Sequence, residues 1–285
     1  MNTVHTIDAL RNEVQQQRTN GKRIVFVPTM GNLHEGHIEL VAQGLKQGDF
    51  VITSIFVNPL QFGANEDLDA YPKTLEQDQK KLATAGNHLV FAPPTSEIYP
   101  QGMNDQTKVI VPGITDPHCG ESRPGHFTGV STVVTMLFNM VQPDVAVFGE
   151  KDFQQLAVIR KMVKDLFLPI KIIGVPTVRE KDGLAKSSRN GYLNAEERRI
   201  APVLQQTLGS IAQKIREGRR DFVTLTTEAQ EQLSRNQLKN DYFNIVDSRS
   251  LKLANEHTQS IIILAAAFLG STRLIDNITI KSTAS

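Results

Sequence analysis

Two histidines three residues apart, His34 and His37, are the first residues whose types and spacing suggest chemistry. They lie near Gly31 and Gly36, after the apolar run 24–27 and before apolar residues at helical spacing. This pattern predicts a buried parallel strand, a turn and the start of a helix. A helix N-terminus presents backbone N–H groups and a positive dipole end to an anion. Imidazoles at that position suit phosphate, and the glycines let a ligand approach the backbone.

Two other interpretations of this histidine pair stay open from the residues alone. The spacing H-x-x-H is common by chance, so a metal-binding pair and a solvated helix start are the alternatives. The position after a strand, between two glycines and without a nearby cysteine cluster, favours nucleotide phosphate over a metal.

The segment resembles the H-x-G-H signature of the nucleotidylyltransferase superfamily. The wider run 28–37, Pro-Thr-Met-Gly-Asn-Leu-His-Glu-Gly-His, resembles the pantothenate synthetase (pantoate–β-alanine ligase) family. This resemblance covers nearly the whole chain and implies an ATP-dependent condensation of pantoate with β-alanine through a pantoyl adenylate. It implies that His34 and His37 are catalytic, with His37 as the expected proton donor. The residues that it implies for ATP in this segment are Met30, Gly31, Asn32, Leu33, His34, Glu35, Gly36 and His37.

A second turn of the same kind follows the apolar run 145–148 and consists of Gly149, Glu150, Lys151 and Asp152. Lys151 can neutralise phosphate, and Asp152 can accept hydrogen bonds from a ribose. An exposed loop with Asp152 as a helix N-cap is the alternative. The run 149–155 resembles the family's motif, which implies that these four residues bind ATP, that Lys151 is catalytic and that Gln155 binds pantoate.

A third candidate site is the run 186–190, which is basic and rich in hydroxyl groups. Serine hydroxyls and an arginine fork suit a triphosphate, and a solvated loop is the alternative. The resemblance implies that this run is the phosphate loop and that Val178 contacts adenine. The family usually has Met or Leu where this chain has Lys186, and commonly a basic residue where it has Met136. The residues of this run are Lys186, Ser187, Ser188, Arg189 and Asn190, of which the first four are the candidates for ATP.

Neutral amides are the candidates for the other substrates. Pantoate carries a carboxylate, two hydroxyls and a gem-dimethyl group, so its site needs donors and an apolar wall. The resemblance implies that Gln61 binds pantoate and β-alanine and that Gln155 binds pantoate, although an exposed polar position is the alternative for each glutamine alone. Asn58 and Arg123 are further candidates for substrate contact, and His126 is left between a structural role and a role at the site. The expected wall is Pro28, Met30 and Phe62.

The elements that must position these residues alternate between strand and helix, which predicts a parallel α/β sheet. Strands are predicted at 24–27, 50–57, 89–92, 145–148 and 170–175, and helices at 6–17, 74–85, 128–140 and 152–166. A short strand is also predicted at 108–111, within the irregular stretch 93–127. Beyond Pro176, helices at 196–217 and 222–235 precede strands at 242–246, 260–269 and 273–280. We therefore predict a Rossmann-like domain over 1–175 and a small α+β domain over 176–285 that closes over the ATP site.

Composition narrows the class of protein. The 285 residues carry a formal charge of +1, which argues against a nucleic-acid surface. The single cysteine, Cys119, allows no intramolecular disulfide, and the polar N-terminus lacks the apolar core of a signal peptide. The longest apolar run, 261–269, is too short for a membrane-spanning helix. We expect a cytoplasmic protein without a membrane partner.

The resemblance implies a homodimer. It also implies that Mg²⁺ accompanies ATP without a firm set of protein ligands, and Glu76 and Asp78 are the possible second contacts of the ion. One alternative function is a nucleotidylyltransferase that acts on a phosphorylated cofactor precursor and lacks the Gln61 and Gln155 pocket. The other is a nucleotide sensor without turnover.

Overall fold

The computed structural model describes residues 1–63 and 66–280, and the chain divides into two compact units. Unit 1 comprises Met1–Thr115, Arg123–Glu150 and Gln155–Pro176. Unit 2 comprises Asp116–Ser122, Lys151–Gln154 and Thr177–Ser285. The chain therefore contributes two short segments to unit 2 before it enters that unit for good at residue 177.

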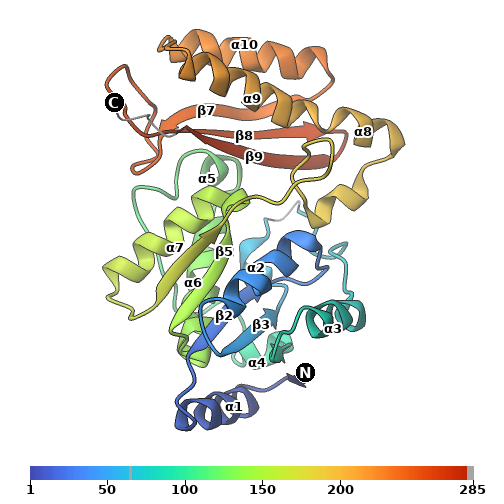
Figure 1. The fold of residues 1–285 in the computed structure, drawn as a ribbon, viewed down its shortest axis with the longest axis vertical. Helices are drawn as coiled ribbons and strands as arrows, with labels where there is room; N and C mark the ends of the chain where they lie inside the picture. Colours follow the sequence, from blue (N-terminus) through green and yellow to red (C-terminus); the bar gives the residue numbers. More distant parts are fainter. Residues whose placement is uncertain (64–65, 281–285) are drawn as a thin grey trace. The chain divides into compact units, whose positions relative to one another are not determined.

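A six-stranded parallel sheet lies at the centre of the described part of unit 1 (Figure 1). Its strand order is β1-β4-β3-β2-β5-β6, and every pairing is parallel. The Rossmann-like parallel sheet is thus confirmed, with β1 as an additional edge strand that the sequence did not indicate. The bounds are β1 Asn2–Val4, β2 Ile24–Thr29, β3 Phe50–Ile55, β4 Leu89–Phe91, β5 Val145–Gly149 and β6 Lys171–Val175.

The direction in which the chain crosses this sheet changes at β2. From β2 the chain proceeds through β3 to β4 on one side, whereas β5 and β6 lie on the other side. Ligands of open α/β sheets bind beyond the carboxyl ends of the strands at such a reversal. The histidine segment follows β2, and the second motif begins at Gly149, the last residue of β5. The fold of unit 1 therefore brings the histidine segment and the start of the second motif, Gly149 and Glu150, to the same edge of the sheet.

Helices occupy most of the connections between these strands. Their bounds are α1 Ile7–Thr19, α2 Glu35–Leu45, α3 Leu75–Thr84, α4 Thr95–Ile98, α6 His126–Val141 and α7 Phe153–Asp165, with 3₁₀ turns η1 Pro59–Gln61 and η2 Glu150–Asp152. The buried helix predicted at 128–140 is confirmed as α6, whose Leu137 and Phe138 are 3% and 2% exposed.

The short strand predicted at 108–111 is wrong. No strand forms there in the described chain; side chains of α6 bond the backbone instead. The N–H of Val109 donates to the Thr132 hydroxyl at 3.0 Å, and the Ser131 hydroxyl donates to the Val109 carbonyl. Because α6 satisfies these backbone groups, the β-branched residues of this segment need no strand partner.

Unit 2 contains an antiparallel sheet in the order β7-β8-β9, with helices beside it. The bounds are α5 Cys119–Ser122, α8 Ala195–Ile200, α9 Val203–Arg216, α10 Phe222–Arg235, β7 Lys239–Asp247, β8 Ile261–Leu269, β9 Thr272–Ile280 and the 3₁₀ turn η3 Ser188–Tyr192. The prediction of a single helix at 196–217 is wrong, because the helix is interrupted between α8 and α9. Pro202 lies at this interruption, and because it lacks an N–H it cannot continue α8.

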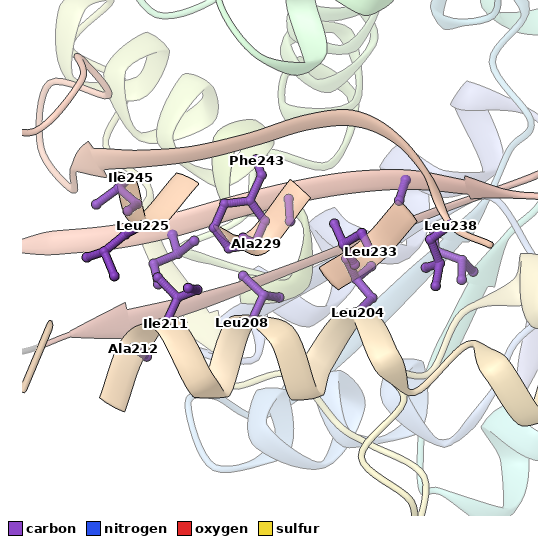
Figure 2. Packing of buried hydrophobic residues seen from close by; sticks show 14 of the residues in the cluster. Leu204, Leu208, Ile211, Ala212, Leu225, Ala229, Leu233, Leu238, Phe243 and Ile245 are labelled. Atoms are coloured by element: carbon purple, nitrogen blue, oxygen red, sulfur yellow. The ribbon is translucent and has the colours of Figure 1, made fainter. Parts of the chain in front are cut away.

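One face of this sheet packs against α9 and α10. Figure 2 shows Leu204, Leu208 and Ile211 of α9 facing the same apolar core as Phe243 of β7. Phe243, Leu208 and Leu225 are each 0% exposed, so the two helices and the sheet bury a continuous core. The small α+β fold of this region is confirmed.

The other face of β7 carries polar side chains that bind the segment Asp116–Ser122. The hydroxyl of Tyr242 lies 2.9 Å from Cys119 Sγ, and the Asn244 amide donates to His118 Nδ1 at 2.8 Å. Burial lowers the pKa of His118, so the neutral ring donates from Nε2 to the carbonyl of Leu251 at 2.9 Å. These contacts explain why this early segment belongs to unit 2.

Among residues 1–63 and 66–280, no helix has the length and apolar content to span a membrane.

Candidate active site

The turn after β2 is held by a carboxylate from α3. Gly31 and Asn32 both have positive φ, at 82° and 51°, so the backbone changes direction sharply before α2. The N–H groups of Asn32 and Leu33 donate to the two oxygens of Asp78, each at 2.8 Å. Asp78 is 0% exposed and also accepts from the Thr74 hydroxyl at 3.1 Å. A buried carboxylate with charge-assisted bonds to backbone N–H groups fixes this turn firmly.

The two histidines cap the helix that follows. His34 is the N-cap of α2, and its Nδ1 accepts from the N–H of Gly36 at 3.1 Å. Nδ1 of His37 accepts from the N–H of His34 at 3.2 Å, and the ring centroids are 4.1 Å apart. A nitrogen that accepts a hydrogen bond carries no proton, so each neutral ring is protonated on Nε2. The helix cap thus sets both rings as Nε2–H donors, the form that suits a phosphate oxygen.

The amide of Gln61 is oriented by contacts within unit 1. Its Nε2 donates to Sδ of Met30 at 2.9 Å, and its Oε1 accepts from Asn58 Nδ2 at 3.2 Å. Gln61 is 9% exposed. The structure therefore brings the predicted substrate residue Gln61 beside Met30 of the histidine segment.

Asn58 is engaged on every side of its amide. Besides Gln61, its Nδ2 donates to the carbonyl of Gly129 at 3.2 Å, and its Oδ1 accepts from the Leu60 N–H and the Tyr99 hydroxyl. Burial raises the pKa of Tyr99 to about 12, so its phenol stays protonated and donates at 2.7 Å. Asn58 is 1% exposed. In this arrangement its amide holds Gln61, and its direct substrate contact stays a prediction.

Arg123 pairs with a carboxylate of the same unit. Its Nε donates to Oε1 of Glu66 at 2.7 Å, and its Nη2 donates to Oε2, a bidentate ion pair. Its Nη1 lies 3.0 Å from Nε2 of His126. The contact of Arg123 with substrate likewise stays a prediction, and its guanidinium is turned toward protein groups.

The motif after β5 is divided between the two units. Gly149 and Glu150 belong to unit 1, whereas Lys151 and Asp152 belong to unit 2. Lys151 Nζ lies 3.8 Å from Oδ2 of Asp152, and the Lys151 carbonyl accepts from the Asn277 amide at 2.9 Å. The backbone of the lysine is thus fixed by β9.

The two glutamines that follow have different surroundings. Gln154 is 5% exposed; its Oε1 accepts from the N–H of Cys119 at 3.1 Å, and its Nε2 donates to the carbonyl of Pro117 at 2.7 Å. Gln155 is half-buried and belongs to unit 1. Gln154 therefore serves the internal structure of unit 2, which leaves Gln155 as the substrate candidate of the pair.

The third motif forms a hairpin-like loop in unit 2. The N–H of Lys186 donates to the carbonyl of Val178 at 2.9 Å, and Lys186 Nζ lies 3.1 Å from Oε1 of Glu180. Ser187 caps η3 by accepting from the N–H of Arg189 at 3.3 Å. The structure thus places the backbone of Lys186 beside Val178, and the binding of ATP by this loop stays a prediction.

The comparison with known families decides the classification. The profile of the Pantoate-beta-alanine ligase family matches residues 2–279. The chain belongs to this family. It is 62% identical to the pantothenate synthetase of Marinobacter nauticus over 98% of this chain and 99% of that one. The pantothenate synthetase of Hahella chejuensis is 60% identical, with 98% and 99% covered.

Solved structures of the family agree with this placement. The pantothenate synthetase of Thermus thermophilus superposes with a TM-score of 0.92 at 42% identity, covering 99% of this chain and 100% of that one. The pantoate–β-alanine ligase of Francisella tularensis, solved in complex with beta-gamma ATP and β-alanine, gives a TM-score of 0.83 at 34% identity and covers 100% of each chain.

The sequence does not indicate several contacts that support these candidate residues. Asp78 holds the turn after β2, Tyr99 holds Asn58, and Gly129 leaves room for η1. A Cβ on Gly129 would lie 2.8 Å from the Cα of Gln61, so only glycine permits this approach. All three contacts join residues far apart in the chain, and no local pattern announces them.

Residues 1–63 and 66–280 contain no group of three or more His, Cys, Asp or Glu side chains arranged to hold a metal ion. Both oxygens of Asp78 accept hydrogen bonds from the protein, and Glu76 is exposed. A metal in this family site thus has no ready-made protein cage among these residues.

Proposed function

We propose that this chain condenses (R)-pantoate with β-alanine at the expense of ATP, giving pantothenate, AMP and pyrophosphate through a pantoyl adenylate. The observation that carries the proposal is the full-length membership of the pantoate–β-alanine ligase family together with the histidine pair at the end of β2. That pair places two Nε2–H donors at the reversal point of the sheet, where an α/β fold binds its ligands.

In the first step the pantoate carboxylate attacks the α-phosphorus of ATP, and the bond to the pyrophosphate oxygen breaks. Negative charge then grows on the phosphate oxygens, and fixed donors stabilise it without reorganising. We assign this role to His37 and His34, with His37 as the proton donor. Lys151 and the side chains of Ser187, Ser188 and Arg189 hold the phosphates that leave as pyrophosphate.

In the second step the amine of β-alanine attacks the acyl carbon, and AMP leaves. Neither step requires a covalent enzyme intermediate, so the protein's contribution is positioning and charge stabilisation. We assign pantoate to Gln61 and Gln155 and β-alanine to Gln61. The Francisella relative was solved in complex with β-alanine, which supports β-alanine as a substrate.

The nucleotide enters as MgATP, so Mg²⁺ is part of the substrate and is bound chiefly by the phosphates. The remaining ATP contacts that we propose are Val178, Lys186 and the run 149–152.

The proposal also includes closure of the C-terminal domain over ATP, a homodimer and a cytoplasmic location. Light scattering of the purified protein tests the dimer.

A product assay tests the proposed reaction. Purified protein with ATP, Mg²⁺, pantoate and β-alanine is expected to give pantothenate, AMP and pyrophosphate in equal amounts, measured by mass spectrometry. A nucleotidylyltransferase would attach the nucleotide to a phosphorylated precursor and release no AMP. A sensor would bind ATP without turnover, and either result would refute the proposal.

A further inference from the structure

Gln61, to which we assign pantoate, is held at its backbone by two residues of unit 1. Nδ1 of His126 lies 2.8 Å from the Gln61 carbonyl oxygen, and Nη2 of Arg123 lies 3.4 Å from the same atom. Nη1 of Arg123 lies 3.0 Å from Nε2 of His126. A guanidinium only donates, so Nε2 of His126 accepts and the ring proton is on Nδ1, which donates to Gln61. The bonds therefore run in one direction, from Arg123 through His126 to Gln61.

The far end of this chain of bonds is anchored by charge. Glu66 accepts from Nε and Nη2 of Arg123, and the two side chains are 22% and 17% exposed. A bidentate pair fixes the plane of the guanidinium as well as its position. Turning Arg123 toward a substrate would break this bidentate pair, which costs free energy because both charged side chains are partly buried.

The same stretch of α6 contacts η1 from a second side. Gly129 admits the backbone of Gln61 within a distance that a Cβ would forbid, and its carbonyl accepts from Asn58. His126 is 8% exposed, so water competes little for its bonds. Gln61 is thus fixed at its carbonyl by His126 and at its side-chain amide by Asn58 and Met30.

We infer that Arg123 and His126 are positioning residues that act on pantoate through Gln61, in place of the direct substrate contact that the sequence suggested for Arg123. The inference rests on the proposed pantoate contact of Gln61. Loss of the bond to its carbonyl lets η1 shift, so the Gln61 amide no longer meets pantoate at the right place. Displacements of this kind weaken the substrate that the residue holds and spare substrates held elsewhere.

The first measurement separates the substrates. His126→Phe keeps a ring of similar size and removes both nitrogens, so the Gln61 carbonyl loses the nearer of its two donors. We expect the KM for pantoate to rise on the order of tenfold, a typical consequence of losing one buried hydrogen bond. The KM for ATP is expected to stay within about twofold, because Asp78 and the cap of α2 hold the two histidines. Equal rises in both values would contradict the inference.

A double-mutant cycle with Gln61→Ala shows whether the effect passes through Gln61. When the amide is absent, its position no longer matters, so adding His126→Phe to Gln61→Ala should change the KM for pantoate less than about twofold. Multiplication of the two single effects would show that His126 acts on the substrate by another route and would overturn the inference.

Conservative variants provide the rescue. His126→Asn places an amide N–H near the position of Nδ1, so it should restore most of the pantoate affinity that His126→Phe loses. If thermal unfolding shows that His126→Phe does not fold, His126→Asn replaces it in the double-mutant cycle. Arg123→Lys keeps the charge opposite Glu66 without the fork and is expected to give an intermediate KM. Failure of His126→Asn to exceed His126→Phe would count against the inference.

The matched control is Arg235→Lys, which alters the exposed ion pair of Arg235 with Glu231 in α10. We expect no change in either KM. Wild-type protein that turns over ATP without need of pantoate would refute the proposed function itself. Wild-type protein that needs pantoate, with His126→Phe unchanged, would refute only the present inference.

Discussion

Two of the segments to which we assign the ATP phosphates are built differently. The turn before α2 is held by the buried Asp78, and its histidines are fixed as helix caps. The loop Lys186–Arg189 is half-buried, and its contacts include a backbone bond to Val178, a serine cap and the ion pair of Lys186 with Glu180. Fixed donors stabilise charge that appears in the transition state, whereas adaptable ones hold a substrate already charged. The first segment should therefore govern kcat and the second the KM for ATP.

The largest expected effect comes from removing a fixed donor. His37→Ala should lower kcat on the order of 10²-fold or more, a typical loss for one donor to a developing oxyanion, and His34→Ala should follow it. Both rings also cap α2, so circular dichroism must show that the helix persists. Near-normal turnover in a folded His37→Ala protein would remove the histidine from the mechanism.

A smaller effect is expected when the donors stay and their support is weakened. Asp78→Asn keeps the shape of the side chain but places an N–H₂ against the backbone N–H of Asn32 or Leu33. We expect kcat to fall on the order of tenfold and the free energy of unfolding to fall by about 2–3 kcal/mol, because a buried charged acceptor is lost. Glu76→Gln, an exposed position of the same helix, is the control and should change neither quantity. Unchanged kcat in Asp78→Asn would show that the rigidity of the turn is irrelevant to catalysis.

How far the sequence predicts this molecule can be seen in these same segments. The histidine turn was predictable because a strand, a turn and a helix start follow one another locally. Asp78 was not, since it lies 45 residues from Leu33 and nothing in α3 indicates its partner. No sequence pattern indicates that Cys119 and Gln154 belong to unit 2. The two residues bond each other, and Cys119 also contacts Tyr242, which lies on β7 much later in the chain. Tertiary hydrogen bonds, rather than local pattern, decide such positions.

Errors in the predicted elements have the same physical origin. The strand predicted at 108–111 had suitable β-branched residues, but Ser131 and Thr132 of α6 satisfy its backbone. The helix predicted at 196–217 kept its apolar spacing across Pro202, and the missing N–H ended it there. The substrate residues follow from the family resemblance and not from a local pattern. The structure adds that the Asn58 amide is hydrogen-bonded to Gln61, Gly129 and Tyr99.

The smallest effects belong to the loop of unit 2. Arg189→Lys should raise the KM for ATP several-fold to about tenfold, because a point charge replaces a fork that suits phosphate, while kcat changes little. Lys186→Leu is the matched variant: it removes the ion pair with Glu180 but keeps the backbone bond to Val178, and we expect less than about a threefold change in either constant. Steady-state kinetics at saturating pantoate and β-alanine give both values. A fall in kcat for Arg189→Lys as large as that for His37→Ala would erase the distinction between the two segments.

Formation of a pantoyl adenylate by this chain can be followed by isotope exchange. Protein, Mg²⁺, ATP and labelled pyrophosphate are incubated with pantoate and without β-alanine, and label in ATP is counted. We predict exchange that requires pantoate and does not require β-alanine, because the amine enters only after the adenylate has formed. Exchange that needs β-alanine, or that proceeds without pantoate, would contradict the adenylate mechanism.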